Sequence, residues 1–464
     1  MNSFANAVNA PEMTRTTNGM SAFTTTGSPL VDLFFNIAAS RNNPNIIATF
    51  SKAYADDKTL AARTLFWSRD VRGGAGERNT FIKIMQSLEK SDPRACIKLL
   101  NYVPEYGRWS DMLHFQTPAV KAAAYQLCAL GIRSMDSLCA KWMPRKGLQA
   151  AELRRVLNMT PKQYRKTLVQ LSNTVEQKMC AGQWDQIEFG KLPSIAAKQY
   201  MQTFARHTPA SWEAYKNALV TGEAKINASA IFPHDVIRGI DRGDAQVGLA
   251  QWEALPNYLG DGDHFILPLV DVSGSMMTPA GKSGAQCLEI AVALGLYLAD
   301  KQKGKFAGMF LTFSEKTELL QLTGNLLDKR AQMLKSNWGM RTNINAAFEK
   351  ILSTAVNNSV PQSEMPKFIL ILSDMQFDRC ANLTGMDMLA VQYRNAGYEL
   401  PKVVFWNLIA TAGNQPVTID ANGVALVSGF SPAIMKSILA AEKFDPMSIV
   451  LETINSDRYA SITL

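Results

Sequence analysis

Through the first half of the chain, apolar residues recur at helical spacing. The clearest stretch runs from Val120 to Trp142, where apolar positions are separated by steps of three and four residues. Similar stretches are bounded by Gly, Pro, Ser or Thr, which begin and end helices, and they lie at 59–69, 80–90, 93–102, 161–180, 194–206 and 210–220. The pattern predicts successive amphipathic helices from about residue 30 to 250, packed as stacked pairs.

Near residue 262 the pattern changes to short, continuous apolar runs. The first, "HFILPLVDVS", is typical of a strand that is buried on both faces. Further strands are expected at 306–313, 367–373, 402–408, 416–419 and 424–428, and they alternate with helices at 285–302, 344–356, 385–396, 432–441 and 446–455. This alternation predicts a doubly wound, mostly parallel sheet whose ligands bind at the carboxyl ends of the strands.

These patterns divide the 464 residues into three parts. Residues 1–28 are rich in Asn, Thr, Ser and Ala and have no apolar period, so we expect a disordered tail. Residues 29–255 are expected to form a helical, repeat-like domain, and residues 256–464 an α/β domain. The predicted fold class is α + α/β, in which an all-helical repeat-like region precedes a doubly wound, Rossmann-like domain.

Charge is distributed unevenly between the two halves. Residues 1–250 carry 31 Lys and Arg against 20 Asp and Glu, a net charge of +11, whereas residues 251–464 carry 17 against 20, a net charge of −3. The excess lies within 51–200, which holds 24 basic and 13 acidic residues. A basic half is expected to meet a polyanion, although a solvated basic surface would leave the same signature.

The sequence gives no sign of a membrane or secretory protein. The first residues do not form a basic start followed by an apolar block, and no apolar stretch reaches the roughly eighteen residues needed to cross a bilayer. Six cysteines without a C-x-x-C pair indicate reduced core thiols, and four histidines without metal-pair spacing argue against zinc. We expect a cytoplasmic location.

Oxygen-bearing side chains follow the predicted strands of the second half. Asp271, Ser273 and Ser275 come directly after the first strand, Thr342 precedes a helix, and Asp374 ends the strand "FILILSD". Two carboxylates and three hydroxyls suit a hard cation such as Mg²⁺, or another divalent cation, that keeps a position for an incoming oxygen. The sequence therefore predicts a metal site at this edge of the sheet.

The same loop has two other interpretations. Gly281, Lys282 and Ser283 spell the end of a phosphate-binding loop, but that motif requires glycine at position 276, where the chain has Met276. Asp271 with its two serines could also only cap a helix, an interpretation that Thr342 and Asp374 make weaker.

With these residues, the second half resembles a von Willebrand factor A (vWA) domain that carries a metal-ion-dependent adhesion site. That family's pattern is D-x-S-x-S on the first loop, a Thr on the second and an Asp after a later strand, which Asp271, Ser273, Ser275, Thr342 and Asp374 match in order. The resemblance implies that the hydroxyls approach the metal directly. It also implies that the open metal position takes an acidic group from a protein partner.

The layout of the whole chain is similar to the Ro (TROVE-module) ribonucleoprotein proteins, in which a ring of helical repeats carries a vWA domain. It also resembles a poorly characterised family that joins a helical region to a vWA domain. The motifs that carry the resemblance to this second family are "FWSRDVRGGAGER" (66–78), "YVPEYGRWSDML" (102–113), "KWMPRKG" (141–147), "YRKTLVQL" (164–171) and "GEAKINASAIFPHDVI" (222–237). The similarity of layout to the Ro proteins implies binding of small structured or single-stranded RNA.

Basic residues interleaved with glycines and aromatics give the RNA interpretation a basis in the residues themselves. The candidate RNA-binding residues are Arg69, Arg72, Arg78, Lys141, Arg145, Lys146, Arg154, Arg155, Arg165 and Lys166. Two structural alternatives remain open here. Trp142 lies on an apolar stripe and is expected to be core, and Arg69 could form an internal ion-pair network with Asp70 and Glu77.

The resulting functional prediction is a non-enzymatic RNA-binding scaffold whose Mg²⁺-bearing vWA domain recruits a protein partner. The alternative is a metal-dependent protein-interaction module that does not bind RNA. A metal-dependent phosphoesterase is a weaker possibility, because two-metal chemistry usually needs more carboxylates than Asp271 and Asp374.

Overall fold

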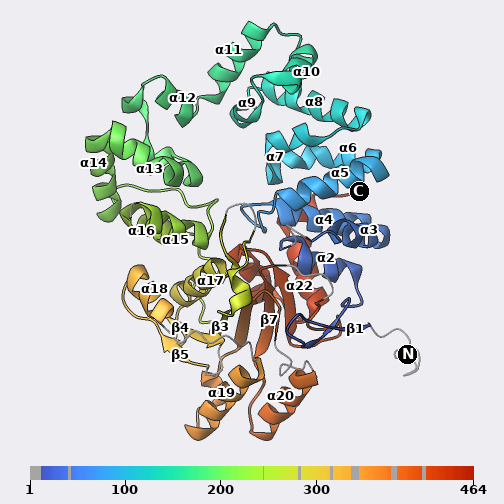
Figure 1. The fold of residues 1–464 in the computed structure, drawn as a ribbon, viewed down its shortest axis with the longest axis vertical. Coiled ribbons are helices and arrows are strands. Elements are labelled where there is room, and N and C mark those ends of the chain that lie inside the picture. The colour runs from blue at the N-terminus through green and yellow to red at the C-terminus, as the bar shows by residue number, and fades with distance from the viewer. Residues whose placement is uncertain are drawn as a thin grey trace.

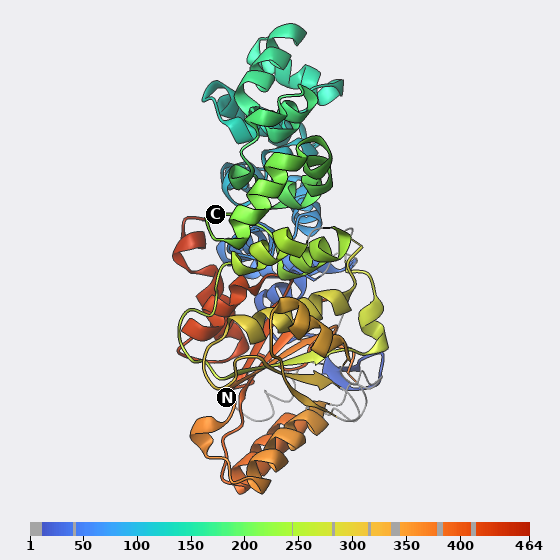
Figure 2. The ribbon, with the colours of Figure 1, turned by 90° about the vertical axis from the view of Figure 1, so that its left-hand side faces the viewer.

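The computed structural model describes residues 12–39, 43–243, 245–280, 284–313, 317–335, 344–377, 384–409 and 414–464. Figure 1 shows an arch of helices that stands on an α/β half with a central sheet. Seen from the side in Figure 2, the helices rise from the α/β half along the long axis of the molecule. The coarse fold class, helices together with an α/β half, is thereby confirmed.

The arch is built from the helices of the first half of the chain. Most are amphipathic, and many begin at Pro, Ser or Thr, as expected from the sequence. They are α2 (Pro29–Ile37), α3 (Ile46–Asp56), α4 (Lys58–Arg69), α5 (Asn79–Ser91), α6 (Pro93–Leu99), α7 (Val103–Tyr106), α8 (Pro118–Arg133), α9 (Ser137–Trp142), α10 (Gly147–Leu157), α11 (Pro161–Ser172), α12 (Val175–Cys180), α13 (Ser194–His207), α14 (Pro209–Val220), α15 (Pro233–Arg242) and α16 (Ala245–Glu253).

Within the described residues, the central sheet has six strands in the order β5-β4-β3-β6-β7-β8. All neighbours are parallel except β4 and β5. The strands are β3 (Ile266–Asp271), β4 (Met309–Phe313), β5 (Leu319–Gln321), β6 (Phe368–Ser373), β7 (Lys402–Asn407) and β8 (Val424–Ser428). The accompanying helices are α17 (Cys287–Lys301), α18 (Leu326–Lys335), α19 (Ile344–Asn357), α20 (Thr384–Asn395), α21 (Met435–Ala440), α22 (Pro446–Ile454) and α23 (Asp457–Ala460).

The chain reverses its direction across the sheet between β3 and β6. From β3 it proceeds outward to β4 and β5, and from β6 it proceeds the other way to β7 and β8. All six residues of β3 are buried, as the continuous apolar run predicted. The register pairs Val270 with Leu372, so Asp271 and Ser373 end their strands side by side. Ligands of open α/β sheets bind at such a switch point.

Both ends of the arch rest on the α/β half. At its start, α2 packs on β8, where the hydroxyl of Ser428 donates a hydrogen bond to the carbonyl of Phe34 at 2.8 Å. At its end, α15 packs on α17. A continuous core joins the sheet to α11, whereas α13, α14 and α16 share a smaller core around Phe204 and Trp212. The helices and the sheet together therefore close a loop, as Figure 1 shows.

The single helix expected over 120–142 is two helices. Met135 has a φ of +61°, in the left-handed region, and ends the path of α8. Asp136 then begins α9 by accepting a hydrogen bond from the amide of Cys139 at 2.9 Å. Leu138 is 56% exposed because the break turns it out of the apolar stripe.

Residues 12–28 are ordered, which corrects the expectation of a disordered tail for that part of 1–28. They contain the hairpin of β1 (Met13–Arg15) and β2 (Ser21–Phe23), and Met20 and Ala22 are fully buried. Three of the polar residues that suggested disorder, Thr16, Thr17 and Asn18, are hydrogen-bonded to residues 376 and 377 of the α/β half. Residues 1–11 lie outside the described residues.

Other differences concern short elements. The expected strand at 416–419 is absent from the described structure, where Gln415 makes only an isolated bridge to Phe23. Strand β5 and helix α18 were not expected. Helices α2, α3, α10, α15 and α16 lie in the region predicted to be helical, but no separate stretch was predicted for them. No helix in the described ranges has both the length and the apolar character required to span a membrane.

Candidate metal centre and basic surface

Four of the five predicted metal ligands come together at the switch point of the sheet. Asp271 ends β3, Ser273 and Ser275 lie in the turn that follows, and Asp374 comes directly after β6. The hydroxyl oxygens of Ser273 and Ser275 are 3.0 Å apart, and the Ser275 side chain lies near Asp374, where it opposes part of the rise in the pKa of that carboxyl. The fifth predicted ligand, Thr342, lies outside the described residues.

Neighbouring backbone and hydroxyl groups hold these carboxylates in place. Oδ1 of Asp271 accepts from the amide of Ser273 at 2.9 Å, and Oδ2 accepts from the hydroxyl of Ser373 at 2.6 Å. Oδ1 of Asp374 accepts from the amide of Gln376 at 3.1 Å. Each carboxylate is therefore oriented by its own loop, and Ser373 links the ends of β3 and β6.

The electrostatics of the pair are unfavourable for two ionised carboxylates. Asp271 is fully buried and Asp374 is 3% exposed. Burial, with the negative charge of Asp374, raises the pKa of Asp271 to about 6. Burial likewise raises the pKa of Asp374. Across the described ranges, neither carboxylate forms an ion pair with Lys or Arg.

This donor set fits a hard divalent cation. Two buried carboxylates without a basic counterion would be neutralised by the charge of the ion, and the hydroxyls add uncharged oxygens. The described residues contain no cluster of three or more His, Cys, Asp and Glu, so the donors here are two carboxylates with serine hydroxyls. Met276 packs in the core beneath the loop, and residues 281–283 of the phosphate-loop alternative lie outside the described residues.

The glycine-rich loop 70–78 packs against protein atoms at the junction of arch and sheet. A Cβ at Gly74 would lie 1.9 Å from the carbonyl oxygen of Trp67. Gly76 has a φ of +72°, and its Cβ would lie 2.7 Å from the ring of Phe232. Close packing within the chain therefore accounts for these two glycines, and it leaves no need for a phosphate to approach the backbone there.

Two of the predicted RNA-binding arginines pair with Asp111. Arg69 is 3% exposed, and its Nη2 is 2.9 Å from Oδ2 of Asp111. Arg78 is partly exposed, with Nε 2.7 Å from Oδ1 of the same carboxylate. Burial removes Arg69 from the RNA-binding set and makes it structural. The internal network is therefore real, although its acidic partner is Asp111 instead of Asp70 or Glu77.

Asp70 binds the carboxyl-terminal segment of the chain instead. Its Oδ2 accepts from Nε of Arg458 and, at 2.9 Å, from the hydroxyl of Tyr459. The hydroxyl of Tyr106 donates to the carbonyl of Arg458 at 2.5 Å. Arg63 adds hydrogen bonds from its guanidinium to the carbonyls of residues 460 and 462. These contacts fasten α23 to the first helices of the arch.

A cationic and aromatic cluster lies between α7 and α9. Arg108 is exposed, and its guanidinium carbon is 4.9 Å from the ring centroid of Trp142. Nζ of Lys141 is 5.7 Å from the same centroid. Arg145 and Lys146 follow directly and are exposed. Trp142 is only partly buried, so the expectation that it belongs to the core is wrong.

Arg108 is not among the residues predicted from the sequence, because the ring on which it stacks, Trp142, is distant in the chain. Asp111 is already paired with Arg69 and Arg78, and no described carboxylate forms an ion pair with Arg108. Partial desolvation, with the nearby cations of Arg69 and Arg78, lowers the pKa of Arg108. The site therefore has an excess of positive charge. The only available signal was the basic flank of Trp142 in the sequence.

The remaining predicted basic residues lie on adjacent helices at the far end of the arch. Arg155, Arg165 and Lys166 are exposed and Arg154 is partly exposed, and none forms an ion pair with a described carboxylate. Helix α11 packs on both α9 and α10, as Figure 1 shows at the end of the arch opposite the sheet. Arg72 is exposed in the loop at the other end. The structure thus groups seven of the ten candidates: Lys141, Arg145, Lys146, Arg154, Arg155, Arg165 and Lys166.

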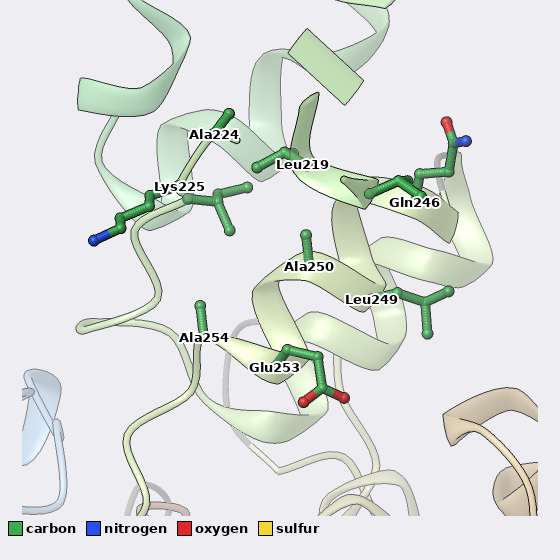
Figure 3. A pocket seen from close by; sticks show the side chains of 10 residues that line it. Leu219, Ala224, Lys225, Gln246, Leu249, Ala250, Glu253 and Ala254 are labelled. Atoms are coloured by element: carbon green, nitrogen blue, oxygen red, sulfur yellow. The ribbon is translucent and has the colours of Figure 1, made fainter. Parts of the chain in front are cut away.

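An apolar groove of about 500 Å³ lies between α14 and α16. Figure 3 shows Leu219, Leu249 and Ala250 along it, with Lys225 and Glu253 as its charged side chains. It lies away from both the metal centre and the basic cluster. It holds no convergent set of titratable groups that would define a reaction site.

Comparison with known structures establishes the class of fold. The chain is similar to a crystal structure of the Deinococcus radiodurans RO (RSR) protein, with a TM-score of 0.51 and 15% identity. The similarity covers 93% of this chain and 100% of that chain. The expected relationship to Ro proteins is therefore confirmed at the level of the fold.

Sequence comparison then gives the family. The family model "Domain of unknown function (DUF2828)" matches residues 16–124 and 129–259, and "Domain of unknown function (DUF7788)" matches residues 266–460. The chain is 31% identical to uncharacterized protein L728 of Acanthamoeba polyphaga mimivirus, over 95% of this chain and 86% of that protein. The chain belongs to the DUF2828 family.

Proposed function

We propose that this protein is a non-catalytic, cytoplasmic RNA-binding scaffold of the ribonucleoprotein type. The basic far end of the arch contacts small structured or single-stranded RNA. The α/β half acts as a vWA-like domain that recruits a protein partner through a bound divalent cation. The Ro-type fold supports this proposal. In the sequence, the resemblance to the Ro proteins implies that the chain binds RNA, and the resemblance to vWA domains implies that the α/β half binds a partner.

The observation that carries the proposal is the pair of Arg108 and Trp142. A guanidinium lying over an indole presents a flat, cationic surface on which an unpaired base can stack. Lys141 lies beside the Trp142 ring, and the exposed Lys146 follows a few residues later in the chain; both can neutralise phosphates that flank that base. A purely structural ion pair would need an acidic partner, and the described residues offer Arg108 none.

The metal centre supplies the second part of the proposal. Asp271, Ser273, Ser275 and Asp374 would hold Mg²⁺ or another divalent cation. When bound, that cation would offer an open position to a carboxylate from a partner protein. Both carboxylates are buried, the hydroxyl of Ser373 donates a hydrogen bond to Asp271, and Ser275 is only partly buried.

Removal of the stacking surface tests the RNA site. We expect Trp142→Ala to weaken binding of a fluorescein-labelled single-stranded RNA about tenfold by anisotropy, since base–aromatic stacking contributes ~1–3 kcal/mol. Arg108→Lys keeps the charge but loses the planar stack, so it should weaken binding less. Trp184→Ala is the matched control, because Trp184 is another partly buried indole and stacks on His207 outside this cluster.

The second candidate function is metal-dependent protein interaction without RNA binding, which the uncompensated carboxylates of Asp271 and Asp374 favour. The two candidates are separated by measuring RNA binding and Mg²⁺ binding on the same preparation. A chain that binds Mg²⁺ by calorimetry but binds no RNA at low salt supports the second candidate. A chain that binds RNA with equal affinity after Trp142→Ala and Trp184→Ala requires a different RNA surface.

A further inference from the structure

The amino-terminal hairpin lies against the loop that carries Asp374. We name residues 12–28 the hairpin segment; its strands are joined by a turn in which Gly19 has a φ of +91°. Figure 1 shows this segment beside the sheet of the α/β half, far from the end of the arch where the RNA candidates gather. An element that precedes the arch in sequence is therefore part of the sheet's environment.

The tip of the hairpin segment binds two residues that follow Asp374. The hydroxyl of Thr16 donates to the carbonyl of Phe377 at 2.8 Å. The amide of Thr17 donates to Oε1 of Gln376 at 2.9 Å, and Nδ2 of Asn18 donates to the carbonyl of Gln376 at 2.7 Å. Three hydrogen bonds from consecutive residues thus fix the loop 376–377 from one side.

The other strand of the hairpin segment is fixed to the α/β half as well. Phe23 and Gln415 exchange two backbone hydrogen bonds, of 2.9 and 3.0 Å. The carbonyl of Thr26 accepts from the amide of Ile419 at 2.9 Å. Because these bonds do not involve the loop 376–377, they hold the hairpin segment in place independently of that loop.

The loop that the tip holds is strained at its first step. Met375 has a φ of +62°, a left-handed conformation that a side chain of this size rarely adopts. Such conformations persist when surrounding contacts determine them. Directly after Met375, the amide of Gln376 donates to Oδ1 of Asp374 at 3.1 Å. A chain of bonds therefore runs from the hairpin tip through Gln376 to the carboxylate.

We infer that the hairpin segment is a positioning element of the metal centre, which holds the strained turn 374–377 so that Asp374 faces Asp271 and Ser275. This inference rests on the proposed Mg²⁺ site and goes beyond it, because it assigns a role to residues outside the loops of the sheet. Groups that orient metal ligands typically change metal affinity by about 10–100-fold when they are removed.

The test is the Mg²⁺ affinity of two matched threonine variants of the full chain, measured by isothermal titration calorimetry. Thr16 is 4% exposed, and Thr16→Val removes its bond to Phe377 and its acceptor for the amide of Met20. Thr24→Val is the control, because the Thr24 hydroxyl is exposed and bonds only within the hairpin segment, to the carbonyl of Glu12. We expect about tenfold weaker binding for the first and less than twofold change for the second.

Hydrogen exchange of the metal-free chain gives a readout that does not involve the metal. The amides of Met375 and Gln376 should exchange faster in Thr16→Val than in Thr24→Val, while those of β6 stay unchanged. A wild-type chain that binds no Mg²⁺ overturns the metal proposal together with this inference. A wild-type chain that binds Mg²⁺, with both variants indistinguishable from it in affinity and exchange, overturns this inference alone.

Discussion

Replacing Asp70 by Asn tests how the carboxyl-terminal segment is fastened to the arch. Asp70 is 1% exposed, and its Oδ2 accepts hydrogen bonds from Arg458, Tyr459 and the amide of Gly73. An asparagine of the same shape would keep one oxygen. In either orientation its NH2 group would face hydrogen-bond donors, and Arg458 would lose its negative partner.

The expected loss follows from these contacts. Breaking a buried charge pair by removing one partner costs about 3–5 kcal/mol, and the lower end applies here because the Arg458 side chain is 34% exposed. Unfolding entropy of about 2.1 cal/mol/K per residue gives roughly 1 kcal/mol/K for a chain of 464 residues. A loss of about 3 kcal/mol therefore lowers Tm by about 3 °C if the chain unfolds as one unit, and by more if it unfolds in parts.

Scanning fluorimetry measures the shift, with Asp261→Asn as the control. The Asp261 carboxylate is 90% exposed and pairs with Lys303, so its loss should leave the Tm nearly unchanged. Hydrogen exchange should also speed up in residues 457–464 of the Asp70 variant alone. If the Tm of Asp70→Asn is unchanged and exchange in residues 457–464 equals that of the wild-type chain, the contacts of Asp70 with Arg458 and Tyr459 do not contribute to stability.

Three further outcomes are expected. Asp271→Asn should abolish the heat of Mg²⁺ binding in calorimetry, and retained binding would remove this carboxylate from the site. Because the pKa of Asp271 is raised to about 6, a proton competes with the cation as pH falls, so Mg²⁺ affinity should drop between pH 7.5 and 5.5. Equal affinities at both values would contradict that pKa. Gly74→Ala should lower the free energy of unfolding by about 1–3 kcal/mol, since its Cβ would meet the carbonyl of Trp67. Gly239→Ala, whose Cβ would meet nothing closer than 3.7 Å, should be tolerated, and similar Tm values for the two variants would refute the packing explanation.

The elements around the metal centre were predictable because the local pattern is strong there. A fully buried parallel strand has a continuous apolar run, so β3 and β6 were visible in the sequence, and the polar residues that end them mark the sheet edge. The approach of Asp271 to Asp374 follows from the switch-point rule for such sheets. No local pattern revealed the role of Ser373, which is explained only by the register of its strand.

The remaining features depend on partners that are remote in sequence. Arg108 and Trp142 meet because α9 packs on the 3-10 turn Trp109–His114 that follows Arg108. Asp70 and Arg458 pair although almost the whole chain separates them in sequence. Likewise, the polar composition of residues 12–28 resembles that of a disordered tail, since nothing local shows that their hydroxyls and amides bond to the loop after β6. Tertiary contacts therefore override local composition at these positions.

The central claim is that the basic end of the arch binds RNA, and the salt dependence of that binding tests it most directly. Fluorescence anisotropy with a labelled single-stranded RNA should give an affinity that falls as KCl rises. About four to six phosphate contacts predict a loss of roughly 10²-fold between 50 and 200 mM, given a slope of about −0.7 per contact. Charge reversal of Arg155 and Arg165 should make the slope shallower, whereas reversal of Lys350 on α19, which is also exposed, should not. Binding that is undetectable at 50 mM salt, or that does not change with salt, would contradict the account.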